Sequence, residues 1–142
     1  STNMATKKAA GTTKLLYTLS TLETIEAIRR GMRYQLFSTI AHSSPFELYE
    51  WSQYLHLSDR TMQRYKKDRV PLDPIHAEKV FEIARLCDYG AQVFGDQANF
   101  DTWLDTTSIP LGDAKPKDLL DSSFGIELVR EELIRIEHGM LA

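Results

Sequence analysis

The C-terminal stretch, residues 117–142, constrains the fold more than any other part of the chain. It reads KDLLDSSFGIELVREELIRIEHGMLA, and its apolar residues recur at alternating spacings of three and four. This spacing places them along one stripe of an α-helix, which has to be buried against other elements. The sequence therefore predicts an amphipathic C-terminal helix. Its apolar stripe consists of Ile126, Val129, Leu133, Ile136 and Met140.

Polar residues and a glycine mark the two ends of this predicted helix. The residues at 121–123 (Asp-Ser-Ser) are each able to cap its first free N–H groups. Gly139 is expected to end it, leaving 140–142 as a short apolar tail. We also expect an ion pair between Glu131 and Arg135, one turn apart. Two interpretations of the tail stay open: it completes the core, or it contacts another protein.

Charge is distributed unevenly along the chain. Residues 1–70 carry eleven Lys and Arg against six Asp and Glu, a net charge of +5. Residues 71–142 carry six against fourteen, a net charge of −8. A basic segment attracts a polyanion such as DNA, and an acidic segment repels it. The two halves are therefore expected to bind different partners.

Two short helices are expected near the start of the basic half, over 22–30 and 32–42. Thr21 is suited to cap the first helix and Gly31 to stop it. The apolar run 15–19 precedes them. Together these segments offer more apolar surface than so small a unit can bury alone, so we expect a homodimer formed mainly by the N-terminal half.

Residues 44–70 have the pattern of two helices joined by a tight turn. The tetrapeptide 44–47 (Ser-Pro-Phe-Glu) combines a capping serine, a proline suited to the first helical position and a glutamate that closes a capping box. His56 lies in the turn and is expected to adopt a left-handed conformation at some cost. Ser58 then caps the second helix, 59–67.

The second helix resembles the recognition helix of Xre/Cro-type helix-turn-helix proteins. Ser58, Thr61 and Arg64 open it at the spacing of that motif. Arg suits guanine, Gln suits adenine and Lys suits phosphate, so its polar side chains fit DNA. The alternative is an ordinary solvated helix face. The residues assigned to DNA are Ser58, Arg60, Thr61, Gln63, Arg64, Lys66 and Lys67.

The acidic half is also expected to be helical. Pro74, after the capping Asp73, begins the longest predicted helix, which Gly95 ends. Asp96 is suited to cap a short helix, and 106–116 is the one substantial loop. With no strand pattern among these elements, the expected class is all-α.

The C-terminal stretch resembles the toxin-binding signature of the Xre/MbcA/ParS antitoxins, the partners of RES-type toxins. The matching features are the approach at 119–121, Gly125, the spacing of Val129 and Leu133, and the closing segment 135–139. The resemblance implies that the end of this helix contacts the toxin. The residues it assigns to the toxin are Arg135, His138, Gly139, Met140, Leu141 and Ala142.

The resemblance also implies a domain organisation and a function. It assigns a helix-turn-helix and dimerisation region to 15–72 and a C-terminal helical toxin-binding domain to 73–142. The arm 1–14 is expected to be disordered for a different reason, because it is small, polar and basic and has no apolar period. The protein would be the antitoxin of a type II system. It would block the active site of a RES toxin that degrades NAD, and bind operator double-stranded DNA to regulate its own operon. The alternative is a stand-alone transcriptional regulator without a toxin partner.

The sequence contains no motif typical of a metal site, a phosphate-binding site or a catalytic nucleophile. Its four histidines and single cysteine lack metal-ligand spacing, and there is no phosphate-binding loop or nucleophile elbow. We therefore expect no enzyme activity, no metal and no cofactor. No apolar run is long enough to span a bilayer, so we expect a cytoplasmic protein without membrane contact. The resemblance implies that it is bacterial.

Overall fold

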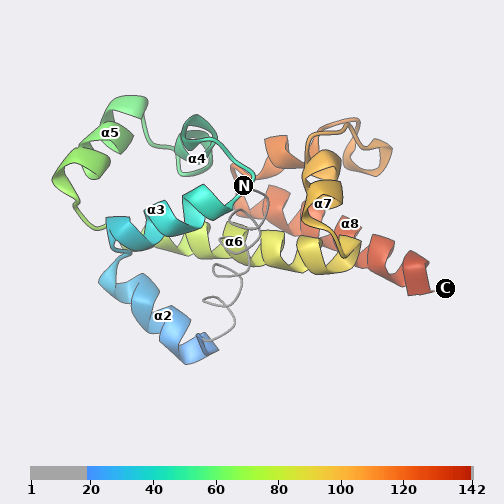
Figure 1. Cartoon of the computed structure of the whole chain (residues 1–142), viewed down its shortest axis with the longest axis horizontal. Helices are drawn as coiled ribbons and strands as arrows, with labels where there is room; N and C mark the ends of the chain where they lie inside the picture. The colour runs from blue at the N-terminus through green and yellow to red at the C-terminus, as the bar shows by residue number, and fades with distance from the viewer. Residues whose placement is uncertain (1–18, 142) are drawn as a thin grey trace. The chain divides into compact units, whose positions relative to one another are not determined.

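The computed structural model describes residues 19–141, and this part of the chain is all-helical (Figure 1). The expected all-α class is confirmed. None of the described helices is long and apolar enough to cross a membrane. The predicted arm 1–14, most of the apolar run 15–19 and Ala142 lie outside the described residues. The elements are α2 (Thr21–Arg30), α3 (Tyr34–Ser43), α4 (Leu48–Tyr54), α5 (Asp59–Asp68), α6 (Pro74–Phe94), α7 (Gln97–Leu104), the 3₁₀-helices η1 (Ile109–Leu111) and η2 (Pro116–Leu119), and α8 (Ser123–Leu141).

The described chain forms two compact units, of which the first ends at Ala84 and the second begins at Arg85. The division falls inside α6, which starts at Pro74 and ends before Gly95, as predicted. Gly95 has φ +68, the left-handed conformation that suits a helix stop. The two units are described separately.

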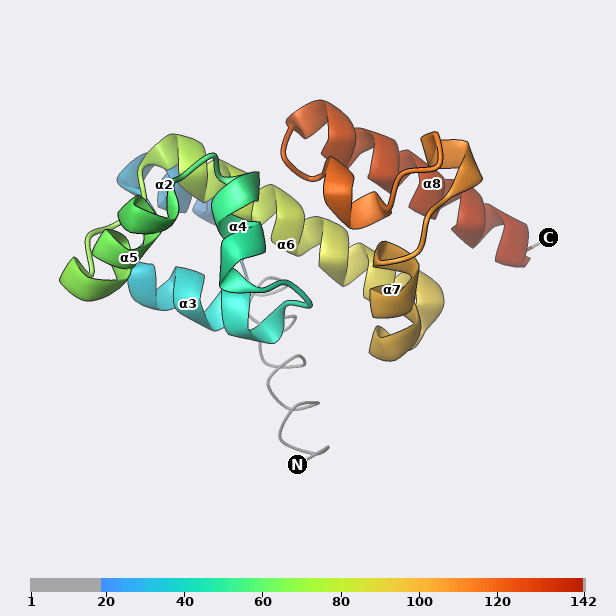
Figure 2. The ribbon, with the colours of Figure 1, turned by 90° about the horizontal axis from the view of Figure 1, so that it is seen from above.

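Buried aromatic residues form the core of the first unit. The helices that contribute to this core, α3, α4 and α5, can be followed in Figure 2. Phe37 and Trp51 are fully buried and meet edge to face, with ring centroids 5.7 Å apart. Phe46 packs in the same way on Trp51 at 5.8 Å and on Tyr54 at 5.2 Å. Edge-to-face pairs bring the positive ring edge to the negative ring face. This cluster fixes α4 against α3.

A short backbone bridge ties the beginning of this unit to the segment before α6. Met32 N–H donates to the Leu72 carbonyl at 3.0 Å, and Leu72 N–H donates to the Met32 carbonyl at 2.7 Å. The prediction that a helix starts at Met32 is wrong, and α3 begins at Tyr34 instead. The N–H and the carbonyl of Met32 are both hydrogen-bonded to Leu72, so they are not part of the helix. Gly31 precedes Met32 with φ +85, and a Cβ there would lie 2.7 Å from the Leu72 oxygen.

Ser20, rather than the predicted Thr21, caps α2. Its hydroxyl oxygen accepts a hydrogen bond from Glu23 N–H at 3.1 Å. Two apolar side chains of α2 face solvent: Leu22 is 75% exposed and Ile25 is 37% exposed. Apolar surface of α2 is therefore left uncovered within the described chain.

The predicted start of α4 at Ser44 is also wrong. The Ser44 hydroxyl donates to the Ala41 carbonyl at 2.7 Å and accepts from the Trp51 indole at 3.0 Å. Because Ser44 closes the end of α3, the cap of α4 passes to Glu47, which forms a capping box with Glu50.

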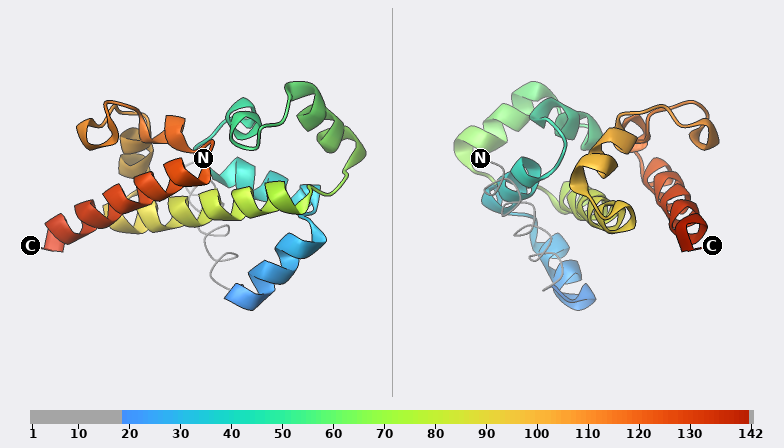
Figure 3. Two further views of the ribbon diagram at one scale, coloured as in Figure 1. Left: turned by 180° about the vertical axis from the view of Figure 1, so that it is seen from behind. Right: turned by 45° about the vertical axis from the view of Figure 1, so that its right-hand side comes forward.

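The second unit is built on the close contact between α6 and α7. The Phe100 ring covers Gly90, where a Cβ would lie only 2.1 Å from a ring carbon. From α8, the side chains of Val129 and Leu133 are fully buried. The Tyr89 hydroxyl of α6 donates to a Glu137 carboxylate oxygen of α8 at 3.0 Å. These contacts orient α8 within the unit (Figure 3).

The start of α8 follows the prediction, but its ion pair and its end do not. Ser122 caps the helix by accepting from Gly125 N–H at 3.0 Å. Arg135 pairs with Glu132 at 2.7 Å rather than with Glu131. The helix passes through Gly139 to its last residue, Leu141. One glycine costs a helix only about 1 kcal/mol relative to alanine, which is too little to end it here.

Candidate functional site

The turn before α5 has the geometry predicted for a helix-turn-helix. His56 adopts φ +55, and Ser58 caps α5 by accepting from Thr61 N–H at 3.0 Å. Met62 is 1% exposed and Tyr65 is 7% exposed, so these two side chains anchor α5 to the core. The rest of the helix is left on the surface.

The side of α5 opposite this anchor is polar and basic. Its exposed side chains fall within one arc of the helix, because positions three and four apart share a face. Lys66, and Arg69 just beyond the helix, are exposed beside this arc. The arc matches the surface expected of a recognition helix. It consists of Arg60, Gln63, Arg64 and Lys67.

A second candidate surface runs along α8, on the side away from its buried residues. Phe124, at its first turn, is 91% exposed, and Leu128, one turn later, is 39% exposed. A phenylalanine this exposed loses the free energy of its burial and contributes nothing to the unit itself. Helical periodicity aligns these two with exposed polar residues farther along. This outward stripe consists of Phe124, Leu128, Glu131, Arg135, His138 and Gly139.

The residues that the sequence assigned to the toxin divide between two sides of α8. Arg135, His138 and Gly139 lie on the outward stripe, whereas Met140 falls on the opposite side and is 64% exposed. Leu141 ends the helix, and Ala142 lies outside the described residues. Sequence reasoning missed Phe124 and Leu128. The available signal was that both are apolar and lie off the buried stripe.

Gly139 has open space around it. A Cβ at this position would meet nothing within 4 Å, so packing inside the chain does not require a glycine. A glycine within a helix lowers its stability relative to alanine. Close approach of another molecule is one physical reason for such a residue.

In residues 19–141, no group of three or more His, Cys, Asp or Glu is arranged to hold a metal ion.

Comparisons with known proteins match two domains of this chain. Residues 23–85 match the model of the antitoxin Xre-like helix-turn-helix domain. Residues 90–139 match the model of the antitoxin Xre/MbcA/ParS C-terminal toxin-binding domain. The chain is also similar to Antitoxin Xre of Yersinia enterocolitica, with 23% identity over 119 residues that cover 83% of this chain and 80% of that protein.

The fold and its two surfaces define a helical protein with a helix-turn-helix domain and a C-terminal protein-binding domain. The chain belongs to the Xre/MbcA/ParS antitoxin family, and its C-terminal domain is the toxin-binding domain of that family. Members of this antitoxin family are not enzymes.

Proposed function

We propose that the protein neutralises a RES-domain toxin that degrades NAD, by covering the toxin's active site with the outward stripe and end of α8. The observation that carries this proposal is Phe124, which is 91% exposed within the matched toxin-binding domain. Buried aromatic anchors contribute a large share of the binding free energy in protein interfaces. The toxin contacts would extend along the stripe to Arg135, His138 and Gly139, and to Met140, Leu141 and Ala142 at the chain end.

This placement changes how the end of the chain would act. A tail released after Gly139 would enter the toxin cleft as an extended segment, but α8 is helical through this position. The end of α8 would therefore approach the cleft as a rigid helix. A rigid helix loses less conformational entropy on binding than a flexible tail does.

The proposed second activity is autoregulation through operator double-stranded DNA. Its support is the exposed arc of Arg60, Gln63, Arg64 and Lys67, together with Ser58 and Thr61 at the start of α5 and Lys66 beside it. Helix-turn-helix proteins commonly bind as two-fold dimers. The exposed Leu22 and Ile25 of α2 would join two copies. Because the NAD that the toxin would degrade and the operator DNA are both in the bacterial cytoplasm, the protein would act there.

The domain boundary between 72 and 73 also belongs to this proposal, with 15–72 acting on DNA and 73–142 acting on the toxin. The alternative, a stand-alone regulator, gains no support because residues 90–139 match a toxin-binding domain.

Cellular NAD is the direct test of the toxin's identity. Inducing a RES toxin encoded beside this gene should deplete NAD, and co-expression of this protein should restore it. If the protein neither restores NAD nor co-purifies with that toxin, the RES assignment is wrong.

A further inference from the structure

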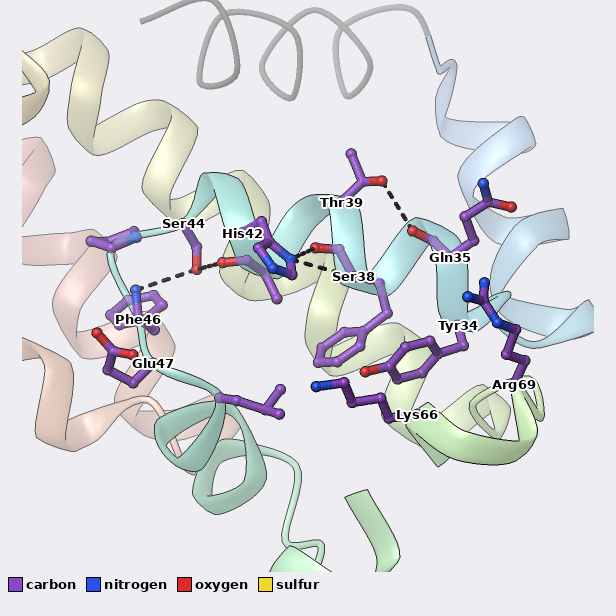
Figure 4. Close-up of a pocket in the computed structure, with 14 residues that line it drawn as sticks. Tyr34, Gln35, Ser38, Thr39, His42, Ser44, Phe46, Glu47, Lys66 and Arg69 are labelled. Carbon is purple, nitrogen blue, oxygen red and sulfur yellow. Dashed lines mark hydrogen bonds between the residues drawn. The ribbon is translucent and has the colours of Figure 1, made fainter. Parts of the chain in front are cut away.

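A pocket of about 670 Å³ opens on the first unit, between α3, the segment leading into α4 and the C-terminal half of α5 (Figure 4). Apolar side chains of the aromatic core, including Phe37 and Phe46, line its floor. Its polar groups come from different elements: Tyr34 from α3, Lys66 from α5 and Arg69 from the residue after α5.

The Tyr34 side chain is mostly buried, but its hydroxyl reaches the solvent of the pocket. Tyr34 is 8% exposed, its hydroxyl makes no hydrogen bond to another described residue, and it is not among the buried polar atoms that lack a partner. Burial raises the pKa of Tyr34, and the positive charge of Arg69 acts in the opposite direction. The hydroxyl is therefore protonated at neutral pH and available to donate to a ligand.

The charges that line the pocket favour an anion. Lys66 and Arg69 contribute two exposed cations. Glu47 is the acidic residue of the lining, and its carboxylate is engaged in the capping box of α4. His42 is also engaged, since its Nδ1–H donates to the Ser38 carbonyl at 2.8 Å.

The N-terminus of α3 adds to this positive potential. No side chain caps it, and its first turn contains no acidic residue. Tyr34 and Gln35, in that first turn, both line the pocket. The N–H groups of a first helical turn favour negative charge.

We propose that Tyr34, Lys66 and Arg69 form a binding site for one phosphate group. A hydroxyl donor beside Lys and Arg side chains suits the several acceptor oxygens of a phosphate. Because Lys66 lies on α5, beside the arc proposed to bind DNA, the favoured source is a phosphate of the DNA backbone. That source rests on the proposed DNA binding. A free phosphate compound shares the same chemistry.

Salt-dependent DNA binding tests the favoured source. Purified full-length protein is titrated into its own promoter fragment and into random duplex DNA at several salt concentrations. The double variant Lys66→Gln, Arg69→Gln should weaken binding to both duplexes by a similar factor. It should also lower the slope of log K against log salt by about 1 to 2, since each phosphate contact contributes about 0.9. Tyr34→Phe, which removes only the hydroxyl, should weaken both about tenfold. Arg130→Gln, an exposed charge change on α8, is the control and should alter neither.

A second titration tests the free source. Inorganic phosphate is added to wild type and to Tyr34→Phe, and the backbone amide NMR signals of residues 34, 66 and 69 are followed. Saturable shifts in wild type that are lost in the variant, with DNA binding unchanged, would assign the site to a free phosphate compound. If Tyr34→Phe changes neither titration, the site does not exist. If Gln63→Ala abolishes preference for the promoter while Tyr34→Phe has no effect on either titration, DNA binding stands and this site alone is overturned.

Discussion

At the scale of single residues, two glycines within helices differ in whether the packing of the fold requires them. Gly90 lies under the Phe100 ring, with no room for a methyl group. Gly139 is surrounded by open space on the outward stripe. The first glycine is required by the packing of the unit itself. No packing contact within the unit requires the second glycine, so we expect it to be needed only for binding a partner.

Replacing Gly90 with alanine should lower the free energy of unfolding by about 1–3 kcal/mol, because the added methyl group has to displace the Phe100 ring. Gly139→Ala should leave the free energy of unfolding unchanged or raise it by at most about 1 kcal/mol. Denaturant unfolding followed by circular dichroism measures both. An equal loss of stability in the two variants would contradict this account of Gly139.

The same Gly139→Ala variant should bind the toxin more weakly than wild type, since the methyl group would occupy space needed for close approach. Calorimetric titration with a catalytically inactive toxin measures this difference. Binding as tight as that of wild type would remove Gly139 from the interface.

At the scale of elements, α8 uses its two sides for different purposes. Val129 and Leu133 hold it in the second unit, and Phe124 and Leu128 face solvent. Substituting the outer pair therefore costs the fold little. An exposed apolar pair on a domain that binds a protein is the expected location of binding free energy.

Replacing both Phe124 and Leu128 with serine should leave the melting temperature within a few degrees of wild type. It should weaken toxin binding at least about thirtyfold, because removing an interface anchor costs about 2 kcal/mol or more. Ile109→Ser is the matched control: it removes another apolar side chain, 83% exposed in the same unit but not on α8. Unchanged affinity of the double variant would exclude the outward stripe.

A separate prediction concerns DNA binding by the arc on α5. Arg60→Ala together with Arg64→Ala should cost about 1–3 kcal/mol for each arginine that contacts a base, and should reduce the preference for the promoter. The control is Arg29→Ala with Arg30→Ala, which removes two exposed arginines from α2. Fluorescence anisotropy on promoter and random duplexes measures both. A double α5 variant that binds like wild type would show that the recognition helix is misassigned.

Sequence reasoning succeeded for elements whose ends are decided by local chemistry. Ser58 caps α5 and Gly95 follows α6 as predicted, because these caps depend on neighbouring residues alone. It failed where contacts with residues farther along the chain compete with these local caps. The Trp51 indole holds Ser44 away from the start of α4, and the bridge to Leu72 takes Met32 out of α3. The solvent exposure of Phe124 depends on how α8 packs, which residue spacing alone does not determine.

At the scale of the whole molecule, the chain separates a basic half from an acidic half. Its family membership assigns a helix-turn-helix to the first and a toxin-binding domain to the second. An acidic toxin-binding half would be repelled by DNA, so the charge division keeps the two partners on different surfaces. Variants on one surface should therefore leave the other activity intact.

Oligomeric state is the first prediction at this scale. We expect a homodimer at micromolar concentration by multi-angle light scattering, and we expect Leu22→Ser with Ile25→Ser to shift it toward monomer by removing exposed apolar area from α2. The control is Ile109→Ser, which should remain dimeric. A monomeric wild type would contradict the prediction, and a dimeric α2 variant would place the interface elsewhere.

The most direct test of the central claim is cellular NAD after toxin induction, measured in cells that co-express one of three antitoxins. Wild type and the Arg60→Ala, Arg64→Ala variant, produced at equal levels from a foreign promoter, should both preserve NAD and growth. The Phe124→Ser, Leu128→Ser variant should accumulate to the same level as a folded protein, but NAD should fall as it does without antitoxin. Preserved NAD with the α8 variant, or lost protection with the α5 variant, would contradict the assignment of toxin neutralisation to α8.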